Sequence, residues 1–580
     1  MAQRFTDIHK RLPMNRIKKF TTLQLAYGII FLIALTLRLV NLNQAPLAEN
    51  EAQRALCALD IQSASCEGTA VIYTFFTGII FVIFGDNNLT SRFLPALLGS
   101  LLVLLPLLLE KKMERKNGLV LAFCLALDPI LIQTSRSADA FILGMVFALY
   151  TLAFAWRQEY FIALLVFIFG MLSGTSFWGT LLLLGGVWLM EKLVRQMSHK
   201  EPEQQGKFTC PFQTIKTNSP ILLFSMTVWL IISTHLFTNI GGILNPIQSA
   251  ALLFKPAGLG NLMLTLPAPL RFAIFLFYSA FGLVLSIAAI FRTDPKQSIL
   301  KQFTMVWMVL AMLVFLFPKF SLYRAAWVCV PMWLLATAEF FRIAQNTYHN
   351  WKKLLIPCLI GLVVFIYLAL QVLRLSYLIS LGLDVQKNLL LLVVPILLCL
   401  LFILLYSYGW SGNAARQVVE ALFILIGLLG LWRTASRAAN LSGSAEYEVV
   451  REALYLHNAD TLLNEIEEYR ISHGIFPADL RIGLSLEEST QSMNWLLRDY
   501  QLQEVVPASI LNSSQFDVMI TYDIQINPPV GFYGQDLELL SNVKVFKADY
   551  SGFLPKEILE WLIYRRGSLE LVDYALWFKF

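Results

Sequence analysis

The chain has 580 residues, of which 57% are hydrophobic and only 14% are charged. A soluble globular protein has about 45–50% apolar and about 25% charged residues, so the composition excludes that class. The net charge of +6 is uneven: residues 440–580 carry 10 Lys and Arg against 21 Asp and Glu, and the preceding part carries +17. This contrast predicts two domains, 1–434 and 435–580. The basic excess of the first domain can set membrane topology, so we expect no nucleic-acid partner.

Apolar runs recur through the first domain, many of them close to the roughly 20 residues that cross a hydrocarbon core about 30 Å thick. They lie at about 22–42, 70–84, 91–109, 118–133, 139–156, 160–173, 176–191, 219–239, 270–291, 302–317, 325–341, 354–373, 389–408 and 418–433. The first run follows a basic N-terminus and has no small-residue cleavage site, so we interpret it as a signal anchor.

The run at 70–84 decides the topology, because its roughly 15 residues are short for a span. If it lies along the outer surface, the basic loops after residue 109 and at 192–217 fall inside, as the positive-inside rule requires. We therefore predict a multi-pass plasma-membrane protein of about 13 transmembrane helices, with a cytoplasmic N-terminus. Outer-face juxtamembrane helices at about 46–84 would place Tyr73, Phe75 and Phe76 at the membrane interface.

Two cysteines, Cys57 and Cys66, share the first outer loop, where the compartment is oxidising. A disulfide between them and a pair of free thiols both fit this placement. No cysteine spacing resembles a metal site.

The region 435–580 is predicted to be an extracytoplasmic soluble α/β domain. Its pattern predicts helices at 445–473 and 493–500 and strands at 479–485 and 516–523. It contains no recognisable catalytic signature.

Three acids at the outer face are candidate catalytic groups. Glu49 and Glu51 follow the first span, and Asp139 lies in the next outer turn. Carboxylates from two turns can converge to act as a general base or to hold a metal or a hydroxyl. Loops outside membranes are often acidic, which is the alternative for the two glutamates. Asp128, deeper in a span, is a rival that can instead cap or kink the helix at Pro129.

The order of motifs resembles the GT-C glycosyltransferases, and in particular the protein O-mannosyltransferases and aminoarabinose transferases of the glycosyltransferase family 39 type. The motifs are LRLVNL and NEAQRA around the first span, YTFFTGIIFVIFGDNNLTSRFLPALLGSLLVLLP after it, and LDPILIQTSRSADAFILG at the second outer loop. The resemblance covers roughly residues 30–190. From 219 to 434 only the span pattern and LYRAAWVCVPMWLLATAEF are similar.

The resemblance implies transfer of a sugar from a polyprenyl-phosphate donor to an acceptor at the outer face, with inversion and a carboxylate base. It implies catalytic roles for Glu51, Asp139 and Glu49. The family's Asp-Glu pair stands here as Asn50-Glu51, and an asparagine cannot serve as a base. Substrate-binding roles are implied for Asn50, Arg136, Lys255, Tyr323 and Arg324, with Lys319, Arg38 and Arg92 as further candidate cations. For each arginine the alternative is anchoring at the membrane surface.

The sequence leaves the sugar, the acceptor (protein, glycan or lipid), any metal and the oligomeric state open. A transporter or flippase for lipid-linked sugars would also need many spans and cationic pockets, but it more often has internal repeats, and no clear repeat is visible. A catalytically inactive membrane scaffold is the second alternative, because of Asn50.

Overall fold

A computed structural model describes residues 22–60, 66, 70–109, 115–197, 219–253, 268–292, 298–317, 321–381, 385–409, 411–441, 448, 455–485, 491–504, 515–522, 531–543, 561, 563 and 569–580. Helices dominate up to residue 438. They are α1 (Thr22–Leu39), α2 (Glu49–Leu59), α3 (Val71–Phe84), α4 (Asn88–Leu101), η3 (Leu102–Leu104), α5 (Leu105–Leu108), α6 (Arg115–Leu127), α7 (Pro129–Ser135), α8 (Phe141–Trp156), α9 (Tyr160–Met171), α10 (Thr175–Met197), α12 (Ser219–Ser233), η4 (Ile240–Leu244), α13 (Asn245–Leu252), α14 (Ala268–Phe291), α15 (Ser298–Leu316), η6 (Leu322–Ala325), α16 (Ala326–His349), α17 (Trp351–Ser380), α18 (Val385–Gly409) and α19 (Gly412–Ala438).

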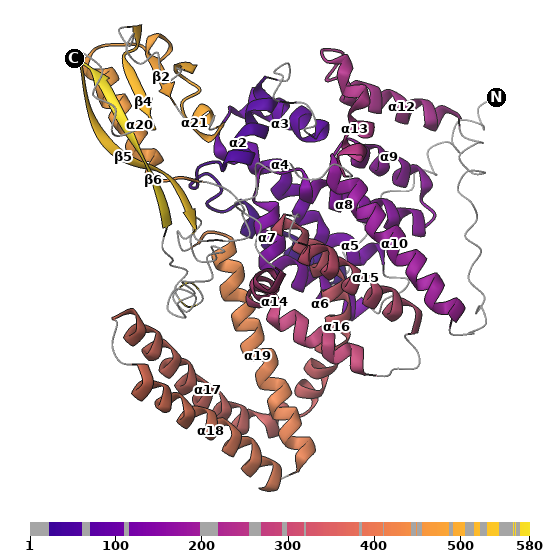
Figure 1. The fold of residues 1–580 in the computed structure, drawn as a ribbon. Coiled ribbons are helices and arrows are strands. Elements are labelled where there is room, and N and C mark those ends of the chain that lie inside the picture. Colours follow the sequence, from indigo (N-terminus) through magenta and orange to yellow (C-terminus); the bar gives the residue numbers. More distant parts are fainter. Residues whose placement is uncertain are drawn as a thin grey trace, which may run out of the picture.

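The helices form one body, and a small sheet lies at one end of it beside α2 (Figure 1). Helices α17 and α18 project from the body as a hairpin packed along α19. Within the described residues six helices are long and apolar enough to cross a membrane, or seven if the bent pair α6–α7 is one span. Each of the 13 predicted spans lies on helix, so the fold is that of a polytopic membrane protein. The number 13 and the orientation stay predictions.

The predicted span 118–133 is broken in two. Helices α6 and α7 meet at an angle of 58°. Asp128 caps α7 by accepting a hydrogen bond from the Leu131 amide at 2.9 Å, and Pro129 occupies the first helical position, where its missing N–H costs nothing. The second oxygen of Asp128 accepts from the Trp333 indole of α16 at 2.8 Å. Asp128 is therefore a capping residue, the structural alternative that the sequence allowed.

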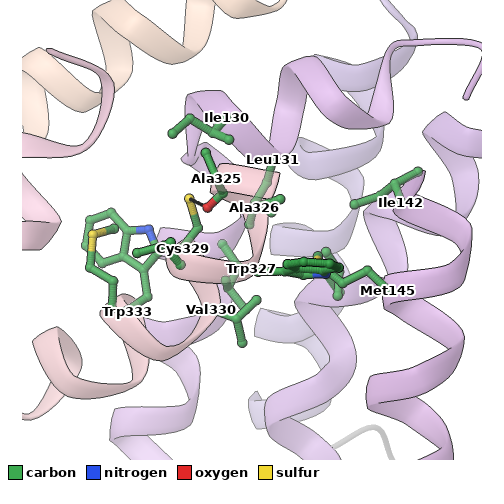
Figure 2. Close-up of a cluster of buried hydrophobic side chains, with 14 of the residues drawn as sticks. Ile130, Leu131, Ile142, Met145, Ala325, Ala326, Trp327, Cys329, Val330 and Trp333 are labelled. Carbon is green, nitrogen blue, oxygen red and sulfur yellow. Dashed lines mark hydrogen bonds between the residues drawn. The ribbon is translucent and has the colours of Figure 1, made fainter. Parts of the chain in front are cut away.

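Helices α7, α8 and α16 meet in a closely packed core (Figure 2). Ile130, Leu131, Ile142, Met145 and Trp333 are all at most 1% exposed there. Because lipid is as apolar as these side chains, the helices are held by close packing and internal polar contacts rather than by escape from water. This core fixes α7 and the start of α8, and the short turn between them carries Asp139.

Helix α3 packs against α2 and α4 and is one of several apolar helices of 10–17 residues. Its place along the outer membrane surface stays a prediction. Tyr73 is fully buried and donates to the Ser91 carbonyl at 2.9 Å, so its predicted place at the membrane interface is wrong. The buried hydroxyl needs a partner, and the neighbouring helix supplies it. The exposed residues of α3 lie instead in its second half, at Ile79, Val82, Ile83 and Phe84.

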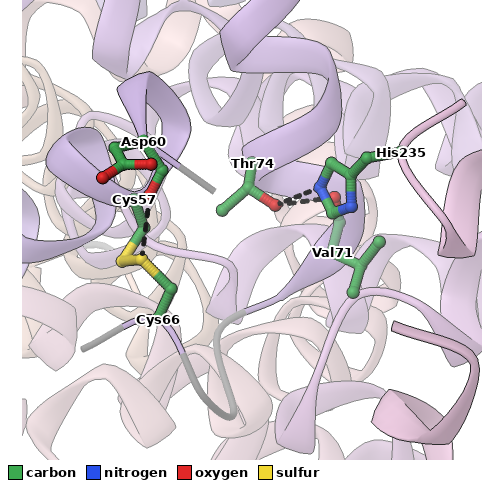
Figure 3. Close-up of a disulfide and its surroundings, with 6 residues drawn as sticks. All are labelled: Cys57, Asp60, Cys66, Val71, Thr74 and His235. Atoms are coloured by element: carbon green, nitrogen blue, oxygen red, sulfur yellow. Dashed lines mark hydrogen bonds between the residues drawn. A yellow bond between two sulfur atoms is a disulfide. The ribbon is translucent and has the colours of Figure 1, made fainter. Parts of the chain in front are cut away.

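Cys57 and Cys66 form a disulfide, one of the two alternatives left open by the sequence. The bond joins α2 to Cys66 (Figure 3). In the same view Thr74 of α3 lies 3.0 Å from His235 Nε2, which ties α3 to the residues after α12. The Thr74–His235 contact therefore ties α3 to the helical body, whereas the disulfide ties Cys66 to α2.

The C-terminal region contains one mixed six-stranded sheet of order β1-β5-β6-β4-β2-β3. Its elements are β1 (Tyr455–Leu456), α20 (Ala459–Ser472), η8 (Pro477–Asp479), β2 (Arg481–Ser485), α21 (Gln491–Leu496), β3 (Gln501–Glu504), β4 (Val518–Thr521), β5 (Phe532–Val543) and β6 (Leu569–Lys579). Strands β2 and β4 pair in parallel, and both lie where strands were predicted. The helix predicted at 445–473 is wrong at 455–456, which pairs with β5 as a strand.

Candidate active site

Asp139 lies in the turn between α7 and α8. One oxygen, Oδ1, accepts from the Phe141 amide at the start of α8, at 3.0 Å. The other, Oδ2, lies 3.4 Å from Arg54 Nη1 of α2. The side chains of Arg54 and Asp139 are 28% and 15% exposed, so this pair is reachable from outside the protein.

Glu51, also on α2, is 3% exposed, and both of its carboxylate oxygens accept hydrogen bonds. Arg92 of α4 binds both its oxygens, at 2.6 Å to Oε2 and 3.3 Å to Oε1. The Ala48 amide donates to Oε2 at 3.1 Å, and the Ala138 amide donates to Oε1 at 2.8 Å. Since Ala138 precedes Asp139, the turn that bears Asp139 is pinned to α2 by Glu51.

Arg92 is completely buried and joins three segments. Besides Glu51, it donates to the carbonyls of Leu42, Ala45 and Pro46 at 2.7–3.1 Å. A buried ion pair is tolerated only when further hydrogen bonds satisfy both charges, and here they do. Arg92 and Glu51 therefore set the path of the chain from α1 into α2.

Glu49 faces the C-terminal domain. Its carboxylate accepts hydrogen bonds from the Gln491 amide, from the Ser492 amide at 3.1 Å and from the Ser492 hydroxyl at 2.8 Å. These donors form the first turn of α21, whose free amides favour an anion. Nearby, Trp495 packs on Phe81, with ring centroids 5.8 Å apart. Glu49 thus joins the two domains.

We expect Glu49→Ala to weaken this docking by about 0.5–2 kcal/mol, the usual cost of losing a helix cap. Amide hydrogen exchange in α21 should become faster, while exchange in β4 stays unchanged. Glu468→Ala, at an exposed acid of α20, is the control. Unaltered exchange in α21 of Glu49→Ala would contradict the docking role.

The remaining predicted binding residues are placed as follows. Asn50 is exposed on α2, and its carbonyl accepts from Arg54 at 3.3 Å. Arg136 is buried and donates from Nη1 to the carbonyls of Leu37, Arg38 and Val40 at 2.7–3.2 Å, which satisfies the C-terminal end of α1. Lys255 and Lys319 lie outside the described residues.

Tyr323 and Arg324 of η6 approach the Asp139 turn. The Tyr323 hydroxyl lies 3.1 Å from the Ser137 hydroxyl. The Arg324 guanidinium lies over the Trp327 ring, 5.3 Å from its centroid. The structure therefore brings Asp139, Arg54, Glu51 and Tyr323 together around residues 136–140, whereas Glu49 points to the other domain. Among the described residues no group of three or more His, Cys, Asp or Glu can hold a metal.

The sequence reasoning missed Arg54 and Ser137. Arg54 has a local signal: it lies four residues after Asn50, one turn along the same helix, within NEAQRA. Ser137 has none, because its role depends on a contact with Tyr323, 186 residues away.

No family model matches the chain, and no curated protein matches its sequence. Solved structures do match. The chain is similar to ArnT from Cupriavidus metallidurans in the apo state, with a TM-score of 0.52 and 12% identity over 86% of this chain and 93% of that one. The same enzyme bound to undecaprenyl phosphate gives a TM-score of 0.51, with the same identity and coverage. A weaker likeness, with a TM-score of 0.41, 12% identity, and 86% and 69% coverage, is to an Archaeoglobus fulgidus oligosaccharyltransferase tethered with an acceptor peptide.

ArnT is an aminoarabinose transferase of the GT-C family. At 12% identity the likeness to ArnT concerns the fold, and it covers 86% of this chain. The resemblance predicted from the outer-loop motifs is confirmed at the level of the fold, which this chain shares with ArnT.

Proposed function

We propose that the chain is a membrane glycosyltransferase that moves a sugar from a polyprenyl-phosphate donor to an acceptor at the extracytoplasmic face. The observation that carries the proposal is the Asp139–Arg54 pair: a base and a cation from two outer elements, 3.4 Å apart and both partly exposed. The fold supports it, because ArnT shares the architecture and was solved with undecaprenyl phosphate.

In this proposal Asp139 is the general base. It accepts the proton of an acceptor hydroxyl as the oxygen attacks the anomeric carbon of the donor sugar. The bond between that carbon and the phosphate oxygen breaks, and its electron pair leaves with polyprenyl phosphate. A single displacement of this kind inverts the anomeric centre.

Arg54 is the cation nearest to this base. Its guanidinium can hold phosphate oxygens in a bidentate manner and stabilise the charge that develops on the leaving phosphate. Asn50, Tyr323 and Arg324 lie on the elements that border the same turn, and we retain them as substrate-binding residues.

We assign Glu51 a positioning role. A carboxylate has about four lone-pair sites, and Glu51 accepts four hydrogen bonds from Arg92, Ala48 and Ala138. Asp139 accepts one amide and one guanidinium, which leaves lone pairs for a substrate proton. The change of the family's Asp to Asn50 is then compatible with activity, because the base lies on another loop.

The test uses the purified full chain in nanodiscs with a panel of polyprenyl-phosphate sugars. We expect release of polyprenyl phosphate with at least one donor and an acceptor extract. No release with any donor would contradict the transferase.

A lipid-linked sugar transporter is the second candidate, because broken spans like α6–α7 are common in transporters. The same donors in sealed vesicles distinguish the two, since a transporter moves intact donor across the bilayer and releases no polyprenyl phosphate.

A further inference from the structure

A carboxylate of the C-terminal region lies inside the helical body. Glu448 follows the last span in sequence, yet it is only 3% exposed. It accepts hydrogen bonds from the Gln133 side-chain amide of α7 and from the Tyr278 hydroxyl of α14. Both donors are buried, and both bonds reach the same oxygen, Oε2. Through these two hydrogen bonds Glu448 links α7 to α14.

Gln133 is connected in turn to the candidate active site. Its carbonyl accepts from the Ser137 hydroxyl at 3.2 Å, and Ser137 contacts the Tyr323 hydroxyl at 3.1 Å. The next two residues are Ala138, which binds Glu51, and Asp139. A continuous series of contacts therefore runs from Glu448 through Gln133 and Ser137 to the turn that carries the proposed base.

The same region supports Tyr278 from another side. Trp561 is fully buried against Phe277 and Tyr278, with ring centroids 6.0 and 6.1 Å apart. The Ile563 carbonyl accepts from Arg433 and Arg437 of α19 at 3.2 and 3.0 Å. Glu448 and Trp561 thus both contact Tyr278 of α14, and Ile563 contacts α19.

We propose that Glu448 is a positioning residue for sugar transfer, which holds α7 and the turn 136–140 so that Asp139 meets the acceptor hydroxyl. The inference rests on the proposed function of Asp139. Helix α7 has only seven residues and is capped by Asp128 at its start. The hydrogen bond between Gln133 and Glu448 ties the second half of α7 to a residue that is also bound to α14. A shift of about 1 Å in a reacting group can cost about 10²-fold in rate.

The experiment compares Glu448→Leu, which fills a similar volume without an acceptor, with Glu448→Gln, whose amide oxygen can still accept both hydrogen bonds. Glu468→Leu, at an exposed acid of α20, is the matched control. In Glu448→Leu we expect hydrogen exchange across 136–141 to become at least about tenfold faster and kcat to fall about 10–100-fold. KM for the donor should change less than about threefold, because Arg54 lies on α2. Glu448→Gln should restore both exchange and kcat to within about threefold of the wild type, on the scale of one altered hydrogen bond.

Tyr278→Phe removes one donor and leaves the carboxylate, so it covers the case in which Glu448→Leu does not fold. It should also make hydrogen exchange at 136–141 faster and lower kcat, but by less than Glu448→Leu does. Unchanged exchange at 136–141 in Glu448→Leu and in Tyr278→Phe would overturn the proposal, and so would an equal rise of exchange in every helix. If exchange at 136–141 responds as expected but the wild type releases no polyprenyl phosphate, the link to the turn holds and the proposed transferase is wrong.

Discussion

Asp139→Asn should lower kcat for release of polyprenyl phosphate by about 10²–10⁴, the usual contribution of a general base. The asparagine keeps the shape of the side chain, and its oxygen can still accept from the Phe141 amide at the start of α8. It cannot take up the proton of the acceptor. Donor binding should survive, because the donor phosphate is assigned to Arg54 and not to the carboxylate.

Steady-state assays in nanodiscs give kcat, and a labelled polyprenyl-phosphate sugar gives the donor Kd. Asp460→Asn, at an exposed acid of α20, is the control and should transfer at the wild-type rate. Transfer by Asp139→Asn at the same rate as this control would remove Asp139 from the role of base.

Glu51→Gln should cause the largest loss of stability among the acids at this site. The substitution leaves the Arg92 guanidinium buried without its counter-charge, and breaking a buried ion pair in this way costs about 3–5 kcal/mol. A lower midpoint of thermal unfolding, followed by tryptophan fluorescence in detergent, measures this loss. Glu468→Gln is the control. It should change the free energy of unfolding by no more than most surface substitutions do, about ±0.5 kcal/mol.

A double-mutant cycle separates the pair from its surroundings. Adding Arg92→Met to Glu51→Gln removes the unpaired charge, so the double variant should be more stable than the sum of the two single losses predicts. Additive losses would show that the pair contributes little. A Glu51→Gln protein that is as stable as the wild type but transfers about 10²–10⁴-fold more slowly would instead support Glu51 as the base.

These two results together assign roles to the acids, which matters because two of the three carboxylates lie on α2 and the third lies in a turn that contacts α2. Glu49 binds the first turn of α21, Glu51 is saturated by Arg92 and two amides, and Asp139 alone of the three is paired only with a partly exposed guanidinium and one amide. The C-terminal domain touches α2 through Glu49 and reaches α7 through Glu448. The two elements that carry Arg54 and Asp139 are thus both bound by the same C-terminal region.

Much of the architecture is determined by the sequence itself. Apolar runs of span length place a helix at every predicted segment, because a buried backbone in lipid must satisfy its own hydrogen bonds. Short apolar segments within 479–485 and 516–523 locate β2 and β4, and the order of outer-loop motifs predicts the GT-C fold. Asp128 before Pro129 signals the break in 118–133, since an N-cap and a proline both start helices.

The roles of the individual polar residues were decided by the tertiary structure. Glu51 and Glu49 are two residues apart on one helix, yet one binds Arg92, 41 residues away, and the other binds Ser492, 443 residues away. Hydrophobic periodicity reports which face of a helix is buried, but it carries no information about which distant donor meets a carboxylate there. The burial of Tyr73 and the contacts of Ser137 and Glu448 have no local signal for the same physical reason: the burial and partners of a polar group are set by packing between segments far apart in the chain.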